Sequence, residues 1–261
     1  MSATTSWEGL LRTPHPCDHL VQLYNDEAFL ARAVSLFVGI GLADGEGAVI
    51  IATPEHVDLF KKSLRGAGLH VDALIEREQL LFFDAKTCLA AFMADGMPER
   101  DKFVSLVTPV FARIRAAGYE KIRLYGEMVN LLWDHNLAGT VALEDLWNQV
   151  LADTGLSLLC AYSIDNFDRH VHRGVLHQIS RCHSHFIPVD DYGRLEQAVD
   201  RAYADVFGTR GDPRSLRSLI TARAAANTVM PPAQAALFAL NGLSSGIADA
   251  VLERTRYHYG V

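Results

Sequence analysis

The residues with the clearest chemical potential follow an apolar stretch near the start of the chain. The segment HLVQLYNDEAFLARAVSLF, residues 19–37, begins like a buried strand and continues as an amphipathic helix, with Asn25, Asp26 and Glu27 at the junction. A junction that binds phosphate carries glycines, a lysine and a hydroxyl, because backbone N–H groups and the lysine contact the phosphates. Here two acids lie at the positive end of the predicted helix, where they satisfy its dipole and repel phosphate. The junction therefore argues against ATP hydrolysis.

Strands and helices alternate over residues 15–190. Continuous apolar runs such as AVIIAT are typical of parallel strands that are buried on both faces, and segments with helical apolar spacing follow them. The alternation predicts a mostly parallel sheet covered on both faces and joined by right-handed crossovers. We expect a three-layer α/β sandwich, with strands at 20–24, 48–53, 80–85, 121–128 and 156–163 and an edge strand at 185–189.

The predicted helices of this region are bounded by proline and glycine. Pro54 begins one helix and glycines end it, which is the usual asymmetry of helix termini. Pro109 lies inside another predicted helix and is expected to kink or break it. The predicted helices cover residues 27–42, 54–68, 101–117, 143–154 and 171–179.

The two ends of the chain differ from this region. Residues 1–14 are polar and are expected to be flexible. Residues 191–261 show helical patterns at 192–208, 213–229 and 232–260, with no strand between them. The segment from Thr209 to Val261 contains six arginines and three acids, and this excess of positive charge is small for a DNA-binding surface. Spaced apolar side chains favour a dimerisation or docking surface instead; they are Leu237, Leu240, Leu243, Ile247 and Val251.

The overall composition excludes several classes of protein. Hydrophobic residues make up 49% of the chain and charged residues 21%, and we find no apolar stretch near the roughly 20 residues that span a bilayer. The N-terminus lacks the basic and apolar zones of a signal peptide, so we expect a cytoplasmic protein. The net charge of −7 disfavours nucleic-acid binding. The four cysteines are widely scattered, which predicts free thiols rather than disulfides or structural zinc.

In an open parallel sheet, small molecules bind beyond the carboxyl ends of the strands. The residues that come directly after each predicted strand, such as Asp84 after the third and Glu127 after the fourth, should converge at that edge. We expect a largely apolar pocket with a few polar groups there. The candidate ligand-binding residues are Tyr24, Asn25, Asp26, Thr53, Glu127, Met128, Asn130, Trp133 and Tyr162.

Each candidate also has a purely structural interpretation. Glu127 fits a ligand contact and a buried carboxylate bonded to loop N–H groups equally well, because a buried carboxylate needs partners. For Met128 and Trp133 core packing is favoured, since such side chains mostly fill space. For Asn25 and Asp26 a helix cap is the simpler interpretation.

The segment DRHVHRGVLHQISRCHSHF, residues 168–186, is rich in side chains that could bind a transition metal. The possible ligands are His170, His172, His177, Cys182, His183 and His185, and the candidates for a metal site are Cys182, His183 and His185. Structural zinc sites gather four ligands at recognisable spacing, and the spacing here is irregular. We therefore favour His183 and His185 as hydrogen-bonded structural histidines, with His170 and His172 in solvent, and predict no metal and no cofactor.

Five motifs in order suggest a family. They are the segment of residues 19–56, then YGEMVNLLW, LEDLWNQV, LLCAYSIDNF and CHSHFIPVDDY. Together they resemble the MEDS sensory domain, named for methanogen and methylotroph regulators and a dichloromethane-responsive repressor, over roughly residues 15–193. The resemblance implies a RecA/KaiC-like fold without a phosphate loop and a ligand sensor of bacterial signalling, often fused to histidine kinases or DNA-binding modules. Glu127 matches the Gly-Glu-Met motif of the family.

These observations predict a non-catalytic cytoplasmic sensor. A small molecule would bind at the carboxyl edge of the sheet, and the helical tail would relay the event to a second subunit or to a signalling partner such as a histidine kinase. No nucleophile elbow, triad or paired-carboxylate signature is recognisable. The alternatives are a residual nucleotide-binding ATPase-like enzyme and a transcription regulator that uses residues 209–261.

Overall fold

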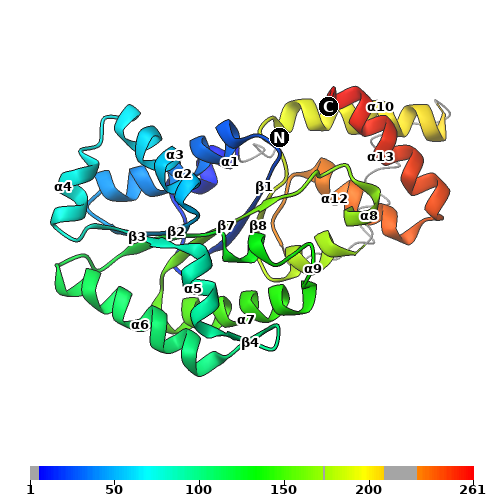
Figure 1. Ribbon diagram of the computed structural model, residues 1–261. Helices are drawn as coiled ribbons and strands as arrows, with labels where there is room; N and C mark the ends of the chain where they lie inside the picture. Colours follow the sequence, from blue (N-terminus) through cyan, green and yellow to red (C-terminus); the bar gives the residue numbers. More distant parts are fainter. Residues whose placement is uncertain (1–5, 173, 209–227) are drawn as a thin grey trace. The chain divides into compact units, whose positions relative to one another are not determined.

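A parallel sheet runs through the first 163 residues of the structure, a computed structural model that describes residues 6–172, 174–208 and 228–261 (Figure 1). The chain divides after Ser163 into two units, here called the N-terminal unit and the C-terminal unit. Within the N-terminal unit the strands lie in the order β3-β2-β6-β7-β1, and every pairing is parallel. The strands are β1 (His19–Tyr24), β2 (Gly47–Ala52), β3 (Leu80–Asp84), β6 (Ile122–Gly126) and β7 (Ser157–Ser163).

Helices cover both faces of this sheet, so the predicted three-layer α/β architecture is confirmed. Figure 1 shows α1 to α3 on one face and α5 to α7 on the other. Strand β2 is buried along its whole length, as a strand covered on both faces requires. The helices are α1 (Trp7–Arg12), α2 (Glu27–Ala43), α3 (Pro54–Gly66), α4 (Val71–Glu76), α5 (Ala85–Phe92), α6 (Arg100–Ala116) and α7 (Leu137–Thr154), with a 3-10 helix η1 (Met128–Leu131) and a small hairpin of β4 (Met93–Ala94) and β5 (Met97–Pro98).

Two helices differ from their predicted form. Helix α6 continues through Pro109 and does not break there. Helix α7 begins at Leu137 rather than at residue 143, because the side chain of Asn136 accepts a hydrogen bond from the backbone N–H of Gly139 (2.9 Å) and caps the helix. Helices α4 and α5 and the hairpin are short, and the sequence pattern did not predict them.

A buried arginine holds the first helix on the sheet. Arg123, in β6, donates from its guanidinium to the carbonyls of Leu11 (3.0 Å), Arg12 (3.3 Å) and Phe37 (2.9 Å). Its Nε lies 2.6 Å from a carboxylate oxygen of Glu46. Leu11 and Arg12 are the last residues of α1, whose carbonyls have no partner within the helix. Arg123 therefore caps α1 and joins it to α2.

Residues 7–12, which belong to the segment expected to be flexible, form a packed helix. Trp7 and Leu11 are buried, and the Trp7 ring packs edge-on against Phe29 with centroids 5.3 Å apart. A helix of this length is unstable by itself, and the free energy gained by burying these apolar side chains stabilises it. The close approach also requires glycine in α2, because a Cβ at Gly41 would lie 2.6 Å from the Nε of Arg123.

In its described residues, the C-terminal unit is largely helical and contains the short strand β8 (His185–Ile187). The predicted helix over 171–179 is replaced by two shorter helices on either side of residue 173, and the pattern at 232–260 divides into two α-helices near Asn241 and Gly242, residues of low helix propensity. Most of the predicted helix at 213–229 lies outside the described residues. The elements are α8 (Arg169–His172), α9 (Val175–Arg181), β8 (His185–Ile187), α10 (Tyr192–Phe207), α12 (Pro232–Ala239), η2 (Leu240–Gly242) and α13 (Ser245–Tyr259).

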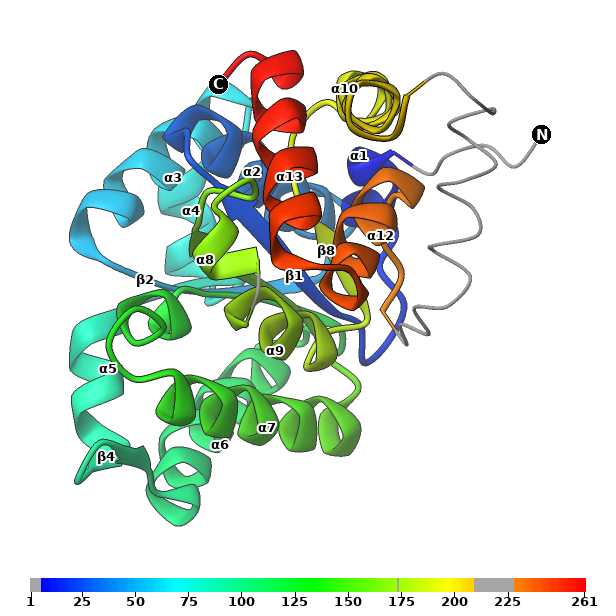
Figure 2. The same cartoon turned by 90° about the vertical axis from the view of Figure 1, so that its right-hand side faces the viewer.

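The apolar side chains of the tail form a core within the C-terminal unit. Leu237, Leu240 and Val251 are each at most 1% exposed and pack with residues of α10. Figure 2 shows α13 beside α10, which is seen nearly end-on. Among the tail residues proposed for a dimer surface, Ile247 retains 38% exposure. None of the helices in the described ranges is long and apolar enough to cross a bilayer.

Replacing Arg123 with Met should destabilise the N-terminal unit by about 3 kcal/mol, because the change leaves Glu46 and the last carbonyls of α1 without their donor. Arg113→Met is the matched control. It removes an exposed ion pair with Glu78 and should cost less than about 1 kcal/mol. Urea unfolding of both variants measures the difference, and equal losses would contradict the anchoring role of Arg123.

Candidate functional site

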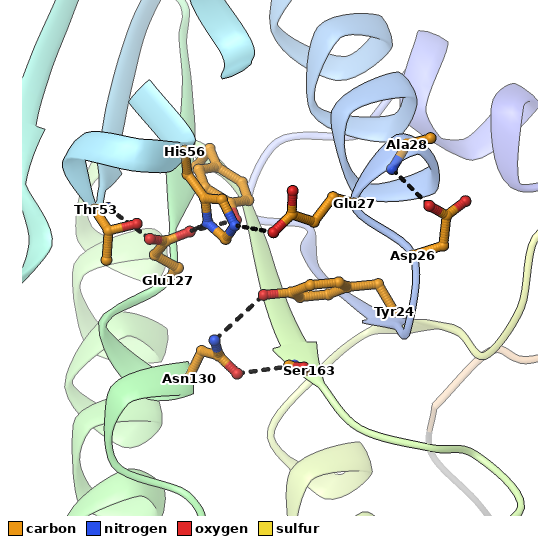
Figure 3. A network of polar contacts seen from close by, with 10 residues as sticks. Tyr24, Asp26, Glu27, Ala28, Thr53, His56, Glu127, Asn130 and Ser163 are labelled. Atoms are coloured by element: carbon orange, nitrogen blue, oxygen red, sulfur yellow. Dashed lines mark hydrogen bonds and ion pairs between the residues drawn. The ribbon is translucent and has the colours of Figure 1, made fainter. Parts of the chain in front are cut away.

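A buried carboxylate organises the carboxyl edge of the sheet. Glu127 directly follows β6 and is 1% exposed. Its Oε1 accepts the backbone N–H of Thr53 (2.5 Å), while Oε2 lies 2.5 Å from Nδ1 of His56 and accepts the Tyr125 hydroxyl (3.1 Å). Figure 3 shows Thr53 and His56 beside the carboxylate. Glu127 thus joins the end of β6 to the turn between β2 and α3.

His56 is the more accessible member of this pair. Its side chain retains 14% exposure. The hydrogen bond to Glu127 raises the pKa of His56 above its ordinary value of 6.5, against the opposing effect of burial. The ring's other nitrogen, Nε2, lies 4.0 Å from a carboxylate oxygen of Glu27 in the first turn of α2. A protonated His56 therefore presents an N–H donor on the side away from Glu127 (Figure 3).

Tyr24 forms a second polar group at the same edge. The Asn130 side-chain N–H donates to the Tyr24 hydroxyl oxygen (3.3 Å), and Asn130 Oδ1 accepts the backbone N–H of Ser163 (2.8 Å). Burial, followed by the charges of Glu127 and Glu27, raises the pKa of Tyr24, so its hydroxyl keeps its proton. The Tyr24 and His56 rings meet edge to face with centroids 6.3 Å apart. The ends of β1, β6 and β7 are linked here by Asn130.

The two acids at the strand-to-helix junction, Asp26 and Glu27, make different contacts. The Asp26 carboxylate accepts the backbone N–H of Ala28 (2.9 Å) and caps α2, which supports the simpler of the two interpretations. Asn25 is exposed. Glu27, also exposed, faces the imidazole of His56. The two carboxylates therefore place negative charge at the start of α2.

The other predicted site residues have separate surroundings. Met128 is buried and lines an apolar cavity of about 30 Å³ together with Ile51 and Phe83, a space for only one or two water-sized groups. Trp133 is half-buried in the turn that follows η1. Tyr162 is fully buried, and its hydroxyl donates to Glu144 in α7. Thr53 contributes its backbone N–H to Glu127.

Sequence reasoning missed His56 and Tyr125 as partners of Glu127. The available signals were positional: His56 lies in the first turn of a helix that directly follows a strand, and Tyr125 precedes Glu127 by two residues. Strand alternation alone does not show that the Tyr125 hydroxyl reaches the carboxylate. Asp84, at the end of β3, caps α5 by accepting the backbone N–H of Thr87 (2.7 Å).

The histidine-rich segment of the C-terminal unit is hydrogen-bonded within itself. His183 Nδ1 donates to the carbonyl of Ile179 (2.7 Å), and Nδ1 of His185 lies 2.9 Å from the Ser184 hydroxyl. The Cys182 thiol donates to the carbonyl of Gln178 (3.4 Å). These bonds support the interpretation of the three predicted candidates as structural side chains.

His172 is the most unusual member of that segment. The expectation that it lies in solvent is wrong, because the side chain is 1% exposed. Within the described part of the chain, neither ring nitrogen has a hydrogen-bond partner. Its ring packs edge-on against Phe238 with centroids 5.3 Å apart. Burial, together with the nearby His177, lowers the pKa of His172 to about 3. The side chain is therefore neutral at physiological pH and acts as an aromatic core residue.

Comparison with known families identifies the class of this domain. Residues 18–184 match the model of the MEDS family, the MEthanogen/methylotroph, DcmR Sensory domain. The match covers more than half of the chain, and the protein belongs to the MEDS family. It therefore carries a sensory domain of signalling proteins, as the motifs predicted. A search of curated proteins finds none that matches the chain. The match ends six residues before the predicted domain boundary at 190, which stays a prediction.

Replacing Glu127 with Gln should lower the pKa of His56, because burial then acts on the imidazole without the carboxylate that favours its charge. In the native chain this pair stabilises the fold below pH 6.5 and loses its contribution as pH rises through the raised pKa of His56. Proton NMR titration of the histidine ring signals measures the shift. An unchanged pKa of His56 in Glu127→Gln would contradict the coupling.

Acid should destabilise the C-terminal unit through His172. Because the folded pKa of about 3 lies below the ordinary 6.5, the stability present above pH 6.5 is lost as pH falls toward 3. His172→Phe keeps the packing on Phe238 without a titrating group, so its melting temperature should fall less over that window. Exposed His170, changed to Phe, is the control. Equal acid dependence of the native chain and His172→Phe would refute this assignment.

Proposed function

We propose that this MEDS protein is a non-catalytic sensor that binds a small molecule at the carboxyl edge of its parallel sheet. The observation that carries the proposal is the convergence of Tyr24, Glu27 and His56 beside the buried Glu127. In open α/β sheets, ligands bind at this edge, and membership of a sensory family supports a recognition role.

The chemistry of these groups suggests the ligand class. Protonated His56 offers an N–H donor, and Tyr24, whose oxygen already accepts from Asn130, offers its hydroxyl proton. Two donors beside aromatic rings suit a small, weakly polar molecule that carries an oxygen acceptor. The Glu127 carboxylate is already bonded to three donors, so it orients His56 and does not contact the ligand itself. We therefore assign ligand contact to His56 and Tyr24 and a positioning role to Glu127.

A nucleotide is disfavoured on electrostatic grounds. The junction after β1 carries Asp26 and Glu27, and Asp26 already accepts the N–H of Ala28 that a phosphate would use. A phosphate there would meet two carboxylates and no lysine of a phosphate loop. We infer that this RecA-like scaffold has a degenerate phosphate loop and serves recognition.

The relay step and the partners belong to the same proposal. We propose that ligand binding in the cytoplasm changes the way the helical tail, residues 191–261, engages a second subunit or a signalling partner such as a histidine kinase. Because Leu237, Leu240 and Val251 are committed to the core of the C-terminal unit, a partner surface would use exposed side chains such as Ile247 and Tyr257, which are 38% and 73% exposed.

Native mass spectrometry of the full chain purified from its own host tests the proposal directly. A small molecule that travels with the protein, and whose amount falls in Tyr24→Phe and His56→Gln, is the expected result. The matched control is His70→Gln, an exposed histidine of the same unit. With the molecule identified, His56→Gln should weaken its binding by about tenfold or more in calorimetry, because a charged donor is lost.

Two further measurements separate the alternatives. Calorimetry with ATP and Mg²⁺ should give no binding heat, and saturable binding would contradict our view of residues 25–27. A DNA-binding regulator would show steeply salt-dependent DNA affinity that disappears on removal of residues 209–261. Such an affinity would replace the proposed relay with direct transcriptional control.

A further inference from the structure

Three side chains that commonly bind metals meet inside the N-terminal unit, away from the site described above. His19 begins β1, Cys160 lies in the middle of β7, and Glu144 lies in α7. The pairing of Val21 with Cys160, and of His19 with Leu158, places His19 and Cys160 on the same face of the sheet. All three side chains are at most 2% exposed.

The distances between their donor atoms match the edges of a coordination tetrahedron. His19 Nε2 lies 3.3 Å from Glu144 Oε2 and 3.4 Å from Cys160 Sγ, and Cys160 Sγ lies 3.7 Å from the same Glu144 oxygen. Zinc bonds of about 2.0 Å to nitrogen or oxygen and about 2.3 Å to sulfur give tetrahedral edges of about 3.3 to 3.5 Å. The three atoms therefore already form one face of such a tetrahedron.

His19 and Glu144 also make hydrogen bonds to neighbouring side chains, and these bonds orient their donor atoms as second-shell bonds do in metal sites. Nδ1 of His19 lies 2.9 Å from the side-chain oxygen of Asn148, and an amide oxygen can only accept. In the neutral ring the proton is therefore on Nδ1, and the lone pair of Nε2 points toward Glu144 and Cys160. The other oxygen of Glu144 accepts the Tyr162 hydroxyl. Second-shell bonds of this kind fix ligand orientation and raise metal affinity.

Charge balance favours a divalent ion. The Nε2 lone pair of His19 and an oxygen of Glu144 are two acceptors 3.3 Å apart, so a proton or a metal cation is needed between them. A thiolate and a carboxylate would bring two negative charges into a buried space, where unpaired charge is costly. A divalent cation neutralises both. The nitrogen, oxygen and sulfur donors together suit zinc or cobalt better than magnesium or calcium.

We propose that His19, Glu144 and Cys160 form a binding site for a transition metal such as Zn²⁺. Three protein ligands leave further coordination open to another donor. The site lies at the face of the sheet that α7 covers, whereas the polar edge around Glu127 lies beyond the ends of the strands. Its existence does not depend on the small-molecule site.

Cobalt titration of the metal-free full chain tests this proposal. Co²⁺ binding should saturate at about one equivalent and give the near-ultraviolet band of a cobalt–thiolate bond together with visible ligand-field bands. The band should be lost in Cys160→Ser, and affinity should fall in His19→Gln and Glu144→Gln. Zn²⁺ should displace the cobalt and raise the melting temperature of the native chain.

The other cysteines supply matched controls. Cys88→Ser alters a cysteine of α5 that is also buried, 8% exposed, and should keep the band. A variant with Cys17, Cys88 and Cys182 all changed to Ser should keep it as well, which tests Cys160 even where Cys160→Ser fails to fold. The absence of the band from the native chain would overturn the proposal. So would a band that survives Cys160→Ser and disappears in Cys182→Ser, because the metal would then lie in the histidine-rich segment.

Discussion

The need to satisfy the buried carboxylate of Glu127 governs the carboxyl edge of the sheet. A carboxylate that is 1% exposed has lost its water and must find donors within the protein. It finds them on two different elements, the turn that begins α3 and strand β6 itself. The position of α3 relative to β6 is set by this requirement, and so is the orientation of His56.

The same strand carries a buried charge of the opposite sign near its other end. Arg123 lies near the start of β6 and Glu127 directly after its last residue, Gly126. Arg123 binds the end of α1 and the middle of α2, while Glu127 binds the start of α3. Helices α1, α2 and α3 are thereby attached to β6, the first two near its start and the third at its end. The hydrogen bonds involve charged groups and are stronger than neutral ones.

This arrangement has consequences for a sensory domain. The groups that hold the scaffold, Arg123 and Glu127, are buried and hydrogen-bonded, whereas His56 and Glu27 retain exposure, as the proposed ligand contact requires. A ligand can shift a conformational equilibrium only if it interacts differently with the two states. In the proposed site, a charged His56 would supply such a difference by exchanging its weak contact with Glu27 for a ligand acceptor.

The alternation of strands and helices was predictable from the sequence because apolar periodicity is a local property. The parallel sheet was anticipated on that basis, and the cap at Asp26 was anticipated from the residue types at the junction. Element boundaries were less accurate where one capping side chain decides the start, as Asn136 does for α7. Helix α1 was missed because its stability comes from Arg123, 112 residues away from Leu11.

The sequence by itself determined the class of fold and the family, through patterns and motifs that are contiguous in the chain. Only the tertiary structure decided which side chains meet. His56 reaches Glu127 across 71 residues, and Tyr162 turns to Glu144 rather than to the edge of the sheet. The same folding brings His19 to Cys160. Such pairings depend on strand register and on helix placement over the sheet, which are set by packing between segments that are distant in sequence.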